Sequence, residues 1–195
     1  MPVSSSPTGG TIVGDSIGGG EAGLPRPGAD AGPGAAGGGL PEPAEIARRG
    51  EELDRELESR CDATHLEYSQ RAFHRILYGS LGVRLGISDE EAELLYWREA
   101  LTFETEPEVQ GALRRAAASG ATLAIISNTN FSARVISAEL EAQGIAGYFE
   151  LVVTSADLGV RKPDGRIFET TVGVLGVRRE LRLYRLRLRR PRLWR

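Results

Sequence analysis

Residues 124–129 read Ala-Ile-Ile-Ser-Asn-Thr, and residues 159–164 read Gly-Val-Arg-Lys-Pro-Asp. The apolar run that ends at Ser127 is typical of a buried strand, and the second stretch follows another apolar run at 150–154. In an open α/β sheet, ligands bind beyond the carboxyl ends of parallel strands. The sequence therefore predicts that the Ser127 hydroxyl and the Lys162 ammonium form a small anion site at one edge of a sheet.

Lysine is unusual in this chain, because Lys162 is the only lysine among 24 basic residues. A lysine ammonium acts on phosphate as a compact point charge, whereas arginine binds through a planar fork. This favours a phosphate-binding role for Lys162. Two simpler interpretations stay open: Lys162 could be a solvated loop residue, and Ser127 could cap the helix that follows it.

Helix and strand patterns alternate around these two stretches. They predict a helix from Pro107 to Gly120, a strand at 122–127, a helix at 132–143, a strand at 150–154 and a helix from Asp164 to about Leu175. Alternation of this kind builds a parallel sheet that is covered by helices. We therefore predict a partial doubly wound, Rossmann-like α/β core over residues 106–177.

The preceding block, residues 44–105, carries a helical pattern without strand signals. Apolar residues recur at helical spacing over 44–60, 65–79 and 89–103. Ser88, followed three residues later by Glu91, has the spacing of a capping box and predicts a helix start. The block is therefore expected to form an inserted all-helical subdomain.

The two ends of the chain differ from the middle in composition. Residues 1–43 are rich in Gly, Pro, Ala and Ser and are expected to be mostly disordered, apart from an apolar patch that ends at Asp15. Residues 178–195 form a basic tail of charge +8, which leaves −11 on the rest of the chain. Because the tail lacks a recognised module and interleaved aromatic residues, we do not expect it to bind nucleic acid.

Composition also limits where the protein works. No run approaches the roughly 18–20 apolar residues of a membrane helix, so no membrane association is expected. The first residues show no secretory signal. The sole cysteine, Cys61, has no partner for an internal disulfide, which fits a cytoplasmic protein. The sequence does not indicate an oligomeric state.

The two motifs resemble, in order and spacing, those of the haloacid dehalogenase superfamily of aspartate-nucleophile hydrolases. Ser127-Asn128 resembles its second motif, Lys162 lies in a stretch similar to its third, and residues 44–105 resemble its helical cap. The resemblance covers about residues 44–177. It implies that Ser127, Asn128 and Lys162 bind a small anionic substrate, and that Lys162 also takes part in catalysis.

The family reaction needs an aspartate nucleophile, a second acid two residues later and, in phosphohydrolases, further acids that hold Mg²⁺. Asp15 is the nearest candidate for the nucleophile and for a metal ligand, although a loop aspartate fits the sequence as well. Ile17 occupies the position of the second acid. No acid follows Glu180, so the resemblance implies Mg²⁺ while the acids that would bind it are absent.

We therefore expect a hydrolase of this type that acts on a small phosphorylated metabolite through an aspartyl intermediate, with impaired turnover in this chain. Two alternatives stay open: a member that keeps the fold without catalysis, and a metal-independent dehalogenase. One hypothesis covers both missing motifs, namely that the ends are translated from another reading frame, or misassembled, around a genuine middle. The gene sequence would test it.

Overall fold

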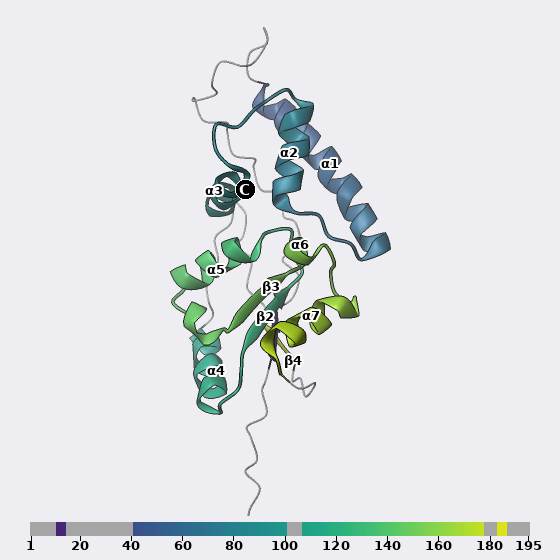
Figure 1. The fold of residues 1–195 in the computed structure, drawn as a ribbon. Coiled ribbons are helices and arrows are strands. Elements are labelled where there is room, and N and C mark those ends of the chain that lie inside the picture. Colours follow the sequence, from purple (N-terminus) through teal and green to yellow (C-terminus); the bar gives the residue numbers. More distant parts are fainter. Residues whose placement is uncertain (1–10, 15–40, 101–106, 178–182, 187–195) are drawn as a thin grey trace, which may run out of the picture.

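The computed structural model describes residues 11–14, 41–100, 107–177 and 183–186. A small sheet lies between helices, and three helices stack beyond one end of it (Figure 1). In chain order the elements are β1 (Thr11–Gly14), α1 (Pro43–Thr64), α2 (Gln70–Ser80), α3 (Asp89–Ala100), α4 (Pro107–Ala118), β2 (Ala124–Ser127), α5 (Ala133–Ala142), the 3₁₀ helix η1 (Ala146–Tyr148), β3 (Leu151–Thr154), α6 (Ser155–Leu158), α7 (Gly165–Leu175) and β4 (Leu183–Leu186).

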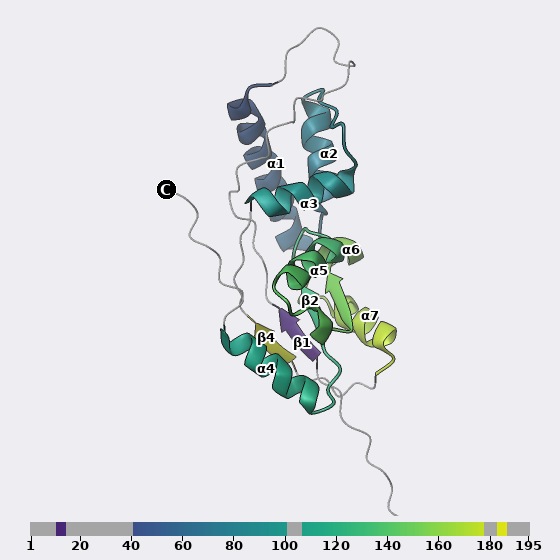
Figure 2. The ribbon, with the colours of Figure 1, turned by 90° about the vertical axis from the view of Figure 1, so that its left-hand side faces the viewer.

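The sheet is built from two parallel pairs of strands. β1 pairs with β4, and β2 pairs with β3, so that Ser127 lies opposite Thr154. β1 also lies beside β2 (Figure 2), which gives the spatial order β3-β2-β1-β4. Helices connect parallel strands because such strands cannot be joined by a tight turn. This is the helix-covered parallel α/β core that the alternating pattern predicts.

Helices cover both faces of the sheet, with α4 and α5 on one side and α7 on the other (Figure 1). Apolar residues of β2, β3, α7 and the loop between α6 and α7 pack into one buried cluster, which comprises Ile126, Val153, Val160 and Ile167. A larger cluster joins α3, α4 and α5 and comprises Tyr96, Trp97, Leu113, Leu123, Phe131, Val135, Ile136, Leu140 and Ile145. Burial of these side chains supplies the main driving force for packing the helices onto the sheet.

The helices α1, α2 and α3 form what we call the helical unit. α1 and α2 pack around their own buried cluster, Ile46, Phe73, Leu77 and Tyr78. Within residues 41–100 the structure contains no strand, apart from an isolated antiparallel bridge between Leu66 and Val160. None of the described helices has the length and apolarity needed to span a membrane.

The residues that the sequence indicates as helix ends cap their helices in the structure. Ser88 Oγ accepts a hydrogen bond from Glu91 N at 3.2 Å, and Glu91 Oε2 accepts one from Ser88 N at 2.9 Å, which is the predicted capping box. Asp164 caps α7 by accepting from Arg166 N at 2.9 Å. Gly176 follows the last residue of α7 as its C-cap, and its φ of 63° lies in the left-handed region that favours glycine.

One segment differs from the sequence expectation. The helix expected over 65–79 begins only at Gln70, because Ser69 accepts from Ala72 N at 3.2 Å and caps it. The residues between α1 and α2 therefore form a non-helical linker, which we call the 65–69 linker. Near the other end of the chain, Leu183–Leu186 within the basic tail forms β4.

Candidate functional site

Ser127 lies at the carboxyl end of β2, where the sequence predicts an anion site. Its side chain is only 4% exposed. The hydroxyl makes no hydrogen bond to any other residue that the structure describes, so it neither caps α5 nor satisfies a strand-end backbone group there. A hydroxyl that no described residue engages can donate to, or accept from, a bound ligand.

Lys162 brings its ammonium to the same strand end. Lys162 Nζ donates to the carbonyl oxygen of Ile126, the residue before Ser127, at 3.1 Å. Burial lowers the pKa of Lys162 to about 8, because an ammonium loses hydration in a partly enclosed position. At neutral pH about nine-tenths of these side chains still carry the positive charge. The site therefore presents a cation that a bound anion would stabilise.

Asn128 fixes the backbone of Lys162. Asn128 Oδ1 accepts a hydrogen bond from Lys162 N at 2.8 Å, and Asn128 Nδ2 donates to Lys162 O at 3.0 Å. The oxygen and the nitrogen of the Asn128 amide are thus both hydrogen-bonded to the backbone of Lys162. This geometry supports a positioning role for Asn128, while the resemblance to the family implies contact with the substrate.

The 65–69 linker is joined by backbone hydrogen bonds to the loops that carry these residues. Glu67 N donates to Gly159 O at 3.0 Å, and Arg161 N donates to His65 O at 2.9 Å, on either side of the Leu66–Val160 bridge. Gln70 N donates to Asn130 O at 2.6 Å, in the loop after β2. The linker and the first residue of α2 therefore contact the two loops that form the candidate site.

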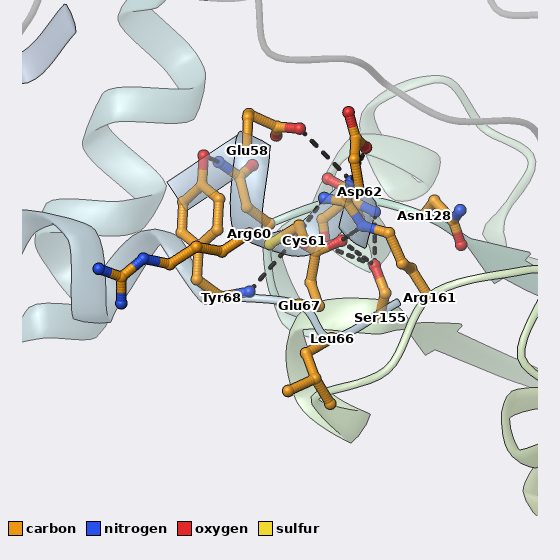
Figure 3. A network of polar contacts seen from close by, with 12 residues as sticks. Glu58, Arg60, Cys61, Asp62, Leu66, Glu67, Tyr68, Asn128, Ser155 and Arg161 are labelled. Atoms are coloured by element: carbon orange, nitrogen blue, oxygen red, sulfur yellow. Dashed lines mark hydrogen bonds and ion pairs between the residues drawn. The ribbon is translucent and has the colours of Figure 1, made fainter. Parts of the chain in front are cut away.

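A buried ion pair reinforces this contact (Figure 3). The Glu67 side chain is 0% exposed, and its two oxygens accept from Arg161 Nε at 3.0 Å and Nη2 at 2.7 Å. Ser155 Oγ, at the start of α6, donates to Glu67 Oε2 at 2.7 Å. Burial alone would lower the pKa of Arg161, but the hydrogen bonds and charges of Glu67 and Glu58 raise it above its usual value.

A second buried carboxylate joins the helical unit to α5. The Glu93 side chain of α3 is 0% exposed and accepts from Arg71 Nε, Ser132 N and Ser132 Oγ, each at 2.8 Å. Arg71 belongs to α2, and Ser132 is the residue before α5. This contact lies at the start of α5 and makes no hydrogen bond to Asn128 or Lys162.

The side chains at the site suit an anion better than a divalent cation. Ser127, Asn128 and Lys162 supply a hydroxyl, an amide and an ammonium, whereas Mg²⁺ is bound mainly by carboxylates and water. Across residues 11–14, 41–100, 107–177 and 183–186, no three His, Cys, Asp or Glu side chains are grouped so that they could hold a metal. The described residues therefore do not fit Mg²⁺.

Asp15, the candidate nucleophile and metal ligand, lies outside the described residues. It is the residue that follows β1 in the sequence, and β1 lies beside β2. Glu67, in contrast, is described in detail but was not indicated by any sequence pattern. An acid between two helices looks like any other surface residue until its partner, 94 positions along the chain, is known.

A family model of haloacid dehalogenase-like hydrolases matches residues 26–181, which include the helical unit and both motifs. The chain belongs to the haloacid dehalogenase-like hydrolase family. The match confirms the resemblance seen in the sequence and, with the observed sheet, the predicted fold class. A search of curated proteins found no match to this haloacid dehalogenase-like hydrolase.

Several solved structures are similar to this haloacid dehalogenase-like chain. A dehalogenase is 14% identical, over 93% of this chain and 77% of its own, with a TM-score of 0.49. A HAD phosphatase from Thermococcus onnurineus is 23% identical, over 72% of this chain and 59% of its own, with a TM-score of 0.46. The L-2-haloacid dehalogenase from Xanthobacter autotrophicus is 18% identical, over 89% and 68%, with a TM-score of 0.46. These similarities do not distinguish a phosphatase from a dehalogenase.

Proposed function

We propose that this haloacid dehalogenase-like hydrolase binds a small phosphorylated metabolite through the Ser127 hydroxyl and the Lys162 ammonium. One observation carries the proposal: Lys162 Nζ donates to the carbonyl oxygen of Ile126, which brings the ammonium to the strand end where Ser127, a residue only 4% exposed, is the next residue. A hydroxyl and a compact cation together provide the hydrogen bond and the charge that a phosphate group needs. The helical unit would act as a cap that excludes water from this group.

Asp15 is the proposed nucleophile. Its carboxylate oxygen would bond to phosphorus while the bond to the leaving alcohol breaks, and water would then hydrolyse the aspartyl phosphate. The alcohol needs a proton as it leaves, and Ile17 stands where the family carries the acid that supplies it. We therefore expect slow turnover, with a strong preference for esters whose alcohol leaves easily without a proton.

A paired assay tests this function. Phosphate release is measured from p-nitrophenyl phosphate and from an alkyl phosphate, each with Mg²⁺ and with a chelator, and halide release is measured from 2-haloacids. We expect slow phosphate release from the aryl ester, less from the alkyl ester, and none from the aryl ester in the Lys162→Met variant.

Binding is measured alongside turnover, by titrating the protein with inorganic phosphate. We expect phosphate to bind to the wild-type chain and not to Lys162→Met. Halide release without any phosphate binding would overturn the proposal in favour of a dehalogenase. A folded chain that neither binds phosphate nor releases either product would show that only the fold of the family is retained.

A further inference from the structure

We propose that Glu67, in the 65–69 linker, is a positioning residue for Lys162 and acts through Arg161. The inference rests on the proposed role of Lys162 in anion binding. It extends that role, because it makes a residue of the helical unit responsible for the geometry of a site in the α/β core.

The contact between Glu67 and Arg161 links the 65–69 linker to the loop that carries Lys162. Two hydrogen bonds, at 2.7 and 3.0 Å, join two nitrogens of the planar guanidinium to the two oxygens of a carboxylate that is 0% exposed. Such paired bonds fix orientation as well as distance. The same carboxylate accepts from Ser155 Oγ and from Tyr68 N, at 2.7 and 3.2 Å, so it is itself held in place.

Two other acids lie near Arg161 but hold it less firmly. Arg161 Nη1 is 3.4 Å from Glu58 and 3.3 Å from Asp62, and the Asp62 side chain is 78% exposed (Figure 3). Water competes for the exposed Asp62, and the contact with Glu58 is longer than either hydrogen bond to Glu67, so both acids hold the guanidinium less firmly. Glu67 is therefore the residue that fixes the position of the Arg161 guanidinium.

The position of Arg161 sets the position of Lys162, because the two residues share a peptide bond. Asn128 holds Lys162 N and O, and Glu67 holds the side chain of the residue just before it. Without the Glu67 charge, the buried guanidinium would lack its main partner and would move toward water. That movement would pull Lys162 away from the carbonyl of Ile126 and from Ser127.

The experiment uses Lys162 as its own reporter, since it is the only lysine in the chain. An amine-acylating reagent is applied to the full chain over a range of pH values, with and without inorganic phosphate. Peptide mass analysis separates the Lys162 peptide from the amino terminus. Glu67→Gln is compared with Glu93→Gln, which also removes the charge of a 0% exposed carboxylate that joins the helical unit to the core.

In the wild type, half-maximal reactivity of Lys162 is expected near pH 8, and phosphate should slow the reaction. In Glu67→Gln the midpoint should move up toward 10.5, as Lys162 enters water, and about tenfold more phosphate should be needed for protection. Glu93→Gln should match the wild type in both respects. Glu67→Asp keeps the charge and should give a smaller shift, so it replaces Glu67→Gln if that variant does not fold.

Unchanged or lower midpoints in the Glu67 variants would overturn the positioning role, and so would equal shifts in the Glu67 and Glu93 variants. A wild type that phosphate does not protect would instead contradict the proposed function. The titration midpoint would still decide the role of Glu67 in that case, because it does not depend on a bound anion.

Discussion

Asn128 holds Lys162 by both backbone groups, accepting from Lys162 N at 2.8 Å and donating to Lys162 O at 3.0 Å. Asn128→Ala removes both hydrogen bonds, each worth about 1 kcal/mol. We expect the free energy of unfolding in urea to fall by about 1–3 kcal/mol and the affinity for sulfate to fall about tenfold. An affinity equal to that of the wild type would show that Lys162 holds its position without this clamp.

Substitution by alanine should affect anion binding at Ser127 and stability at Ser155. The Ser127 hydroxyl makes no hydrogen bond among the described residues, so Ser127→Ala should leave stability within about 0.5 kcal/mol and weaken sulfate binding about tenfold. Ser155 Oγ accepts from Thr129 N at 2.8 Å and donates to Glu67, so Ser155→Ala should lower stability by about 1–3 kcal/mol. Urea unfolding and calorimetric titration check both. A large stability loss in Ser127→Ala would point to a structural role.

Anion binding should weaken as the pH rises through about 8. The pKa of Lys162 is lowered to about 8, so the ammonium is charged below this pH and neutral above it. A bound anion favours the charged form, so binding at pH 8 should take up protons. Sulfate is a suitable probe because it stays doubly charged over this range. Titration calorimetry in buffers of different ionisation enthalpy measures the uptake, and Lys162→Met should abolish both binding and uptake.

His74 should make the fold sensitive to acid. The side chain is buried, and Gln70 Nε2 lies 3.0 Å from His74 Nε2. Asn130 Nδ2 donates a hydrogen bond to Gln70 Oε1, and this orients the amide nitrogen of Gln70 toward the imidazole ring. Within the described structure His74 Nδ1 makes no hydrogen bond. Burial lowers the pKa of His74 to about 4, although Asp89 acts against this effect.

The unfolded chain therefore binds a proton at His74 near pH 6.5, well before the folded chain does. The contribution of His74 to stability is complete above pH 6.5 and is lost as the pH falls toward 4, by about 3 kcal/mol in total. In His74→Gln this part of the loss should disappear from urea unfolding curves measured between these pH values. His65→Asn is the control, because it removes the other histidine and suits the left-handed backbone at that position, φ 57°. Equal acid sensitivity in both variants would contradict the assignment.

Buried and exposed ion pairs should differ in their effect on stability. Glu93→Gln leaves the Arg71 charge without its main buried partner and should cost about 3 kcal/mol. Glu52→Gln breaks the exposed pair with Arg48 on α1 and should cost at most about 1 kcal/mol. Urea unfolding measures both. Similar values for the two variants would mean that water reaches Glu93 in solution.

Local sequence patterns were sufficient to predict a helix or strand where the signal for that element lies within a few residues. The alternation of helix and strand patterns predicts β2, α5, β3 and α7, since each element is encoded by its own periodicity and end signals. The same patterns place Ser127 and Lys162 after neighbouring strands. They could not place the start of α2, because the helical spacing of apolar residues continues through the 65–69 linker, which tertiary hydrogen bonds hold in a non-helical conformation.

The sequence alone determined the α/β class, the helical unit before the core, the family and the residue types at the candidate site. Only the tertiary structure decided that Leu183–Leu186 joins the sheet beside β1, that Asn128 clamps Lys162, and that Glu67 holds Arg161. The physical reason is distance along the chain. Strand pairing and buried ion pairs depend on residues that are far apart in sequence, whereas helix caps and periodicity depend on neighbours.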